Sequence, residues 1–112
     1  MDSVVINGEV YEKKSSVDKH PWVVVRSKDA GVFLGRLIRE DGTRVELSES
    51  RRIYYWDGAA TLSQLSQEGV KSVANCKFPC PMPSQTVFGV CEIIPASAAA
   101  VASIQSVPIW KR

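Results

Sequence analysis

The chain has 112 residues, with 14 basic and 12 acidic side chains, a formal net charge of +2 and 45% hydrophobic residues. This length fits one domain over 1–112, since domains cluster at about 100–150 residues, and the hydrophobic fraction excludes a disordered or fibrous chain. No apolar run reaches the roughly 18–20 residues of a membrane-spanning helix, and the first residues lack a signal-peptide pattern. We therefore expect a cytoplasmic protein, and the small net charge argues against a nucleic-acid polymer as its partner.

The cysteines Cys76, Cys80 and Cys91 and the single histidine, His20, are the first residues to consider as metal ligands or redox groups. Three thiols cannot form a fully paired disulfide framework. A structural zinc site needs four ligands, and His20 lies far from the thiols along the chain. We expect reduced thiols that pack as small apolar side chains, with no metal and no cofactor.

The first predicted elements lie before residue 27. Asn7-Gly8 separates two short apolar runs within 4–13, which is a hairpin signal, and the polar stretch over 14–20 is typical of a loop. We expect residues 1–20 to form a peripheral hairpin and loop. The β-branched run over 22–26 predicts an internal strand.

Two further strands are predicted over 32–39 and 43–48, joined at Asp41-Gly42. This dipeptide between apolar runs favours a two-residue type I′ turn, and the two residues that flank the turn then oppose each other. An arginine on the buried face of such a hairpin either extends its guanidinium to solvent or faces a ligand pocket or subunit contact. The predicted buried face carries Val32, Leu34, Arg36, Ile38, Val45 and Leu47.

Residues 51–56, Arg-Arg-Ile-Tyr-Tyr-Trp, are predicted to form a fourth strand. Because side chains alternate along a strand, Arg52, Tyr54 and Trp56 should share one face. A short helix is predicted next over 62–68.

Local signals define that helix. Thr61-x-x-Gln64 is a capping box, in which the hydroxyl and the amide side chain each satisfy a main-chain N–H of the first turn. Gly69 is typical of a helix C-terminal stop.

The remaining elements follow a proline-rich stretch over 71–85, which excludes a helix or a central strand there. A fifth strand is predicted over 86–94, and Ser97 should cap an alanine-rich helix over 98–105. The elements together predict an α+β fold with an antiparallel sheet of four to five strands and two short helices. The expected contacts of a homo-oligomer are Val101, Ile104 and Trp110.

Arginines next to aromatic residues form the strongest candidate site. A guanidinium offers two parallel hydrogen bonds to a phosphate, an aromatic face stacks on a base, and a helix start near Gly58 adds free N–H groups. These residues favour a small nucleotide-like anion as ligand, although a surface of packed aromatics and paired arginines, or a protein-binding patch, would give the same pattern. No catalytic triad, phosphate loop or paired-carboxylate motif occurs, so we expect no enzyme. The candidate ligand-binding residues are Arg26, Arg36, Arg51, Arg52, Tyr54, Trp56 and Thr61.

Short motifs follow one another at defined spacings through most of the chain. They are Arg26, Ala30-Gly31-Val32, Gly35, Arg51-Arg52, Tyr55-Trp56, Gly58-Ala59, Thr61-Leu62, Gly69-Val70, Glu92-Ile93-Ile94-Pro95, Ser103-Ile104 and Trp110. In order and spacing they resemble a family of small phage and prophage proteins that carry an uncharacterised domain. The resemblance covers about residues 22–110.

Together with this resemblance, the size of the chain and its arginine-plus-aromatic chemistry make it similar to Thoeris anti-defence proteins. The resemblance implies a phage protein that binds and sequesters a nucleotide second messenger, of the cyclic ADP-ribose or cyclic oligonucleotide type. Other roles that fit are an anti-CRISPR-like inhibitor that binds a host defence complex, and an accessory structural protein of a phage. On the sequestration hypothesis phosphates bind Arg26, Arg36 and Arg52, a base stacks on Tyr54 and Trp56, and Thr61 caps the helix or donates.

Overall fold

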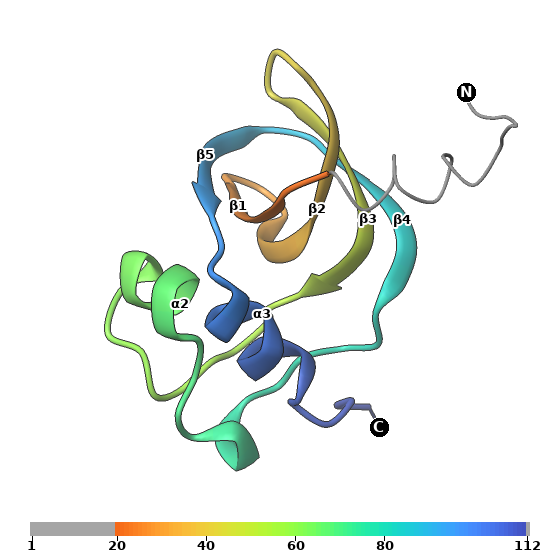
Figure 1. The fold of residues 1–112 in the computed structure, drawn as a ribbon. Coiled ribbons are helices and arrows are strands. Elements are labelled where there is room, and N and C mark those ends of the chain that lie inside the picture. Colours follow the sequence, from red (N-terminus) through yellow and green to blue (C-terminus); the bar gives the residue numbers. More distant parts are fainter. Residues whose placement is uncertain (1–19, 112) are drawn as a thin grey trace, which may run out of the picture.

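The computed structural model describes residues 20–111, so the hairpin predicted over 4–13 lies outside the described residues. The described part forms one five-stranded antiparallel sheet and two α-helices, which confirms the α+β class (Figure 1). The elements are β1 (Trp22–Ser27), β2 (Gly31–Asp41), β3 (Arg44–Arg52), α2 (Leu62–Glu68), the single 3-10 turn η1 (Val73–Asn75), β4 (Met82–Val87), β5 (Val90–Pro95) and α3 (Ala98–Gln105).

The sheet has the strand order β4-β3-β2-β1-β5 and curls strongly. In a flat sheet the two edge strands would lie about 19 Å apart, at about 4.8 Å per strand. Only Phe88 and Gly89 connect β4 to β5, and three Cα steps span at most about 11 Å. The edges must therefore approach each other, and Figure 1 shows β4 running over the top of the sheet into β5 around β1.

The curled sheet is buried on both faces. Val23, Val24 and Val25 of β1 are all at most 4% exposed. Val24 belongs to a core between the sheet and the two helices, whereas Val23 and Val25 belong to a second core enclosed by the strands alone. This explains the nearly continuous apolar run and confirms the predicted internal strand, which β2 and β5 flank.

The β2–β3 turn differs from the prediction by one residue. Asp41 pairs with Arg44, so Gly42 and Thr43 form the turn. A type I′ turn needs positive φ at both central residues, and only Gly42 has it, at +62°. The predicted type I′ turn is therefore wrong, because Thr43 is β-branched and disfavours a left-handed backbone.

The predicted buried face of this hairpin is also wrong in part. The register shifts between Leu37 and Arg39, and Ile38 at this irregularity is 38% exposed. Leu34 faces the helix-side core, whereas Val45 packs in the core enclosed by the strands. Irregular pairing within a strand interrupts the strict alternation on which the prediction depended.

Residues 53–56 do not form the predicted fourth strand. β3 ends at Arg52, and beyond it Tyr55 makes one isolated bridge with Lys77. Ile53 and Trp56 both contact the helix-side core, so the predicted alternation ends here and Trp56 does not share a face with Arg52.

The predicted strand over 86–94 is divided in two. Phe88 and Gly89, with φ of +69° at the glycine, separate β4 from β5, which lie at opposite edges of the sheet. Pro83 lies within β4, where an edge strand tolerates a missing N–H.

Both predicted helices are confirmed with their caps, and Figure 1 shows them together beneath the sheet. The Thr61 hydroxyl accepts a hydrogen bond from the Gln64 N–H at 3.1 Å, although the Gln64 side chain accepts from the Ala60 N–H instead of from the cap residue. Between the helices, the Ser103 hydroxyl accepts from the Val70 N–H and donates to the Val70 carbonyl.

Candidate functional site

Two of the predicted phosphate-binding arginines are engaged in ion pairs. Arg26 lies 3.6 Å from the Glu92 carboxylate, and Arg36 donates to Glu49 at 2.9 Å. The Arg36 guanidinium also lies over the Trp22 ring, 4.7 Å from its centroid, and its side chain is only 18% exposed. Arg36 therefore packs along the sheet and holds a carboxylate, which leaves little of its charge for a ligand.

Arg51 is buried and binds main-chain carbonyls. Its residue exposure is 4%, and its guanidinium donates to the carbonyls of Pro79 at 3.1 Å, Ile104 at 3.0 Å and Phe78 at 3.4 Å. Burial lowers the pKa of Arg51, while the neighbouring Cys80 thiol acts in the opposite direction. The side chain thus joins β3 to the end of α3 and to the loop before β4.

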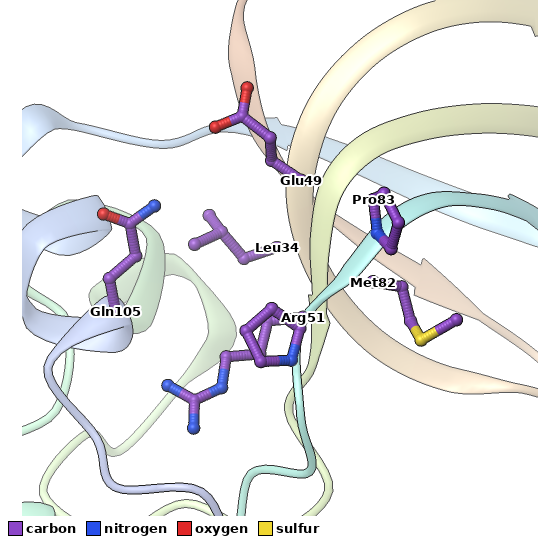
Figure 2. A pocket seen from close by; sticks show the side chains of 7 residues that line it. Leu34, Glu49, Arg51, Met82, Pro83 and Gln105 are labelled. Atoms are coloured by element: carbon purple, nitrogen blue, oxygen red, sulfur yellow. The ribbon is translucent and has the colours of Figure 1, made fainter.

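A first pocket, the Leu34 pocket, lies beside Arg51. Its volume is about 400 Å³, and Figure 2 shows Leu34 between Glu49 and Gln105, with the Arg51 guanidinium directed away from all three. Glu49 has a left-handed backbone, with φ of +51°. Apolar walls and a carboxylate do not suit an anion. The lining residues are Leu34, Glu49, Arg51, Pro81, Met82, Pro83 and Gln105.

A second pocket, the Arg52 pocket, also has a volume of about 400 Å³ and joins the turn after β1 to the segment after β3. Arg52 donates to the Ala30 carbonyl at 3.2 Å, and its guanidinium lies 4.7 Å from the centroid of Phe33. Neither Arg52 nor Lys28 makes an ion pair with any residue of 20–111, although Asp29 adds one carboxylate to the lining. The lining residues are Ser27, Lys28, Asp29, Ala30, Gly31, Val32, Arg52, Ile53 and Tyr54.

Ser27 holds the turn that forms one wall of the Arg52 pocket. Its hydroxyl accepts from the N–H groups of Asp29 at 3.3 Å and Ala30 at 3.1 Å, and donates to the Phe88 carbonyl at 2.6 Å. Gly31 follows with φ of +99°, which a residue with a Cβ rarely adopts. The wall is therefore preorganised by local hydrogen bonds.

Aromatic rings continue from the Arg52 pocket toward the C-terminus. Tyr54 stacks on Trp110, with centroids 5.4 Å apart and planes 7° apart, and Tyr54 is still 63% exposed. The Lys77 ammonium lies 5.7 Å from the Trp110 ring and 5.9 Å from the Tyr55 ring. Sequence reasoning missed Lys77 and Lys28, because contacts between distant segments bring both of them to this site.

The other predicted site residues lie outside the Arg52 pocket. Trp56 donates from its indole nitrogen to the Ala59 carbonyl at 3.3 Å, and the Thr61 hydroxyl caps α2. Val101 and Ile104 are buried, at 8% and 0% exposure, in the core of the protomer itself. Oligomer formation through the remaining residue, Trp110, stays a prediction.

The structure thus defines an α+β domain on a curled antiparallel sheet, with a small pocket that carries cations and an aromatic ring. Residues 20–104 match the family described as "Domain of unknown function (DUF6948)", and the chain belongs to this family. Comparisons with curated proteins and with solved structures give no significant match. The matched range covers most of the chain.

No helix within 20–111 has the length and apolar character needed to cross a membrane. Within the same range, no group of three or more His, Cys, Asp or Glu side chains is placed to hold a metal ion.

Proposed function

We propose that the protein is a non-catalytic binding protein whose Arg52 pocket takes up a nucleotide-derived anion. The observation that carries the proposal is that Arg52, Tyr54 and Lys28 line one pocket, and that neither cation makes an ion pair within residues 20–111. An Arg guanidinium binds phosphate through two parallel hydrogen bonds. The exposed Tyr54 ring, backed by Trp110, offers a surface on which a base stacks.

The size of the pocket supports a ligand of limited size. Small-molecule sites have volumes of roughly 300–1,000 Å³, and the Arg52 pocket, at about 400 Å³, lies near the lower limit. It suits one nucleotide unit. A cyclic oligonucleotide would need contacts beyond the pocket.

The resemblance to small phage proteins extends the proposal to a biological role. We propose that a phage uses the protein in the host cytoplasm to sequester a nucleotide second messenger, of the cyclic ADP-ribose or cyclic oligonucleotide type, and so to block a defence response. Sequestration needs slow release of an intact ligand and no chemical step. The exposed rings of Tyr54 and Tyr55 and the exposed Ile109 favour one alternative, an inhibitor that binds a host defence protein.

Isothermal titration calorimetry tests the proposal, with AMP, cyclic ADP-ribose and cyclic di-AMP as probes. We expect at least one probe to bind and to be recovered unchanged after heat release. Arg52→Glu should abolish binding, because it replaces the pocket's guanidinium with a carboxylate. Arg39→Glu, at an exposed arginine of β2 outside the pocket, is the matched control and should bind normally.

Three outcomes would contradict the proposal. They are no binding of any probe at millimolar concentration, unaltered affinity of Arg52→Glu, and chemical conversion of a bound probe.

A further inference from the structure

Several cations of residues 20–111 make no ion pair with a described carboxylate. Arg26, Arg36, Arg44 and Lys71 each pair with a carboxylate, and Arg51 binds carbonyls. The cations of 20–111 that pair with no carboxylate and lie at or next to the aromatic rings are Lys28, Arg52, Lys77 and Lys111.

A second group of residues, the Trp110 surface, adjoins the Arg52 pocket and is exposed except for the half-buried Trp110. It comprises Tyr55, Lys77, Ile109 and Trp110, and Tyr54 joins it to the pocket because Tyr54 both lines the pocket and stacks on Trp110. Tyr55 is 50% exposed and Ile109 53%. Main-chain contacts hold the surface in place, since Tyr55 bridges to Lys77 and Phe78 bridges to Ile109.

The chemistry of this surface is that of single-stranded nucleotide binding. Arg52 lines the pocket together with Tyr54, Tyr54 stacks on Trp110, and the Lys77 ammonium lies 5.7 Å from the Trp110 ring. The exposed aromatic rings therefore lie next to positive charge. Nucleotide chains are bound in this way, with phosphates on cations and bases on rings. An acidic peptide would use the cations and leave the stacked rings without a planar partner.

We infer that the ligand carries at least two nucleotide units, with one in the Arg52 pocket and the second on the Trp110 surface. This inference rests on the proposed function and specifies its ligand class. The second unit places its phosphate at Lys77 and its base on Tyr55, whose ring lies 5.9 Å from the same ammonium. The small net charge of +2 agrees with a ligand of a few phosphates.

Calorimetry at constant salt with AMP, the linear dinucleotide pApA and cyclic di-AMP tests the inference. We expect one of the dinucleotides to bind at least about tenfold more tightly than AMP, because stacking one base on an aromatic ring contributes roughly 1–3 kcal/mol. Lys77→Ala and Tyr55→Ala should remove that advantage and leave AMP affinity unchanged. Arg52→Ala should weaken every probe, and Arg39→Ala, the matched control, should weaken none.

The outcomes separate the two claims. If AMP binds through Arg52 but neither dinucleotide binds more tightly, or if Lys77→Ala retains the advantage, the inference is overturned and the proposed function stands. If no probe binds, the proposed function itself fails and the inference falls with it. If an acidic peptide competes with the dinucleotide while Tyr55→Ala has no effect, the Trp110 surface is a peptide site and the inference is wrong.

Discussion

The adjacent residues Arg51 and Arg52 should have opposite roles, and substituting each with methionine separates protein stability from ligand binding. Methionine keeps much of the aliphatic stem and removes the guanidinium. Arg51→Met should destabilise the fold and leave the ligand affinity of the folded protein unchanged. Arg52→Met should weaken nucleotide binding and leave stability nearly unchanged, because its side chain is exposed and donates one hydrogen bond in the structure, to Ala30.

The size of the Arg51 effect follows from its three carbonyl partners. Hydrogen bonds from a charged donor contribute about 1.5–3 kcal/mol each. After the substitution, the carbonyls of Ile104 and Phe78 each still accept a hydrogen bond from a main-chain N–H. Only the Pro79 carbonyl loses the one donor that it has within residues 20–111. Removing a buried charge also relieves a desolvation cost, which offsets part of the loss. We therefore expect Arg51→Met to lower the free energy of unfolding by about 2–4 kcal/mol.

Thermal denaturation followed by circular dichroism measures this difference. A change of 1 kcal/mol corresponds to about 4–8 °C in a domain of roughly this size, so the Arg51→Met midpoint should fall by about 10–25 °C. Arg52→Met should fall by less than about 8 °C. An Arg51→Met midpoint within a few degrees of wild type, or a larger loss for Arg52→Met, would refute the structural role assigned to Arg51.

Three further predictions concern the helices and the charge of the site. Gly69→Ala should lower the free energy of unfolding in urea by about 3–5 kcal/mol, because φ is +76° and a Cβ would overlap the Ser103 side chain between α2 and α3; a loss below 1 kcal/mol would contradict this packing. Thr61→Ala should cost about 1 kcal/mol in the same assay, since the hydroxyl caps the Gln64 N–H, and an unchanged midpoint would show that the cap contributes nothing. Raising NaCl from 50 to 300 mM should weaken nucleotide binding several-fold in calorimetry, because exposed cations are screened by salt; affinity that does not depend on salt would contradict a phosphate contact with Arg52.

Elements with local signals could be predicted from the sequence to within a residue or two. Both helices begin after a hydroxyl residue, Thr61 or Ser97, that accepts a hydrogen bond from an N–H three residues ahead, so the signal and the structure lie in one short segment. The predicted strand over 86–94 failed for the opposite reason. The chain divides at Gly89 because β4 and β5 lie at opposite edges of the curled sheet. That arrangement depends on pairing between strands that are distant in the sequence.

The candidate site shows the same difference between local and long-range information. Alternation along residues 51–54 correctly placed Arg52 and Tyr54 together. It could not show which of the two arginines is buried, because both faces of the sheet are apolar. Lys28 and Lys77 reach the site through contacts between segments distant in sequence, and no local pattern marks them.

Nuclear magnetic resonance of the ¹⁵N-labelled protein, titrated with AMP to saturation, tests the central claim most directly. Binding in the Arg52 pocket should shift amide signals over 27–32 and 52–54 and leave Leu34 and Gln105 in the Leu34 pocket unchanged. No shifts at millimolar AMP, or shifts confined to the Leu34 pocket, would contradict the assignment of nucleotide binding to Arg52.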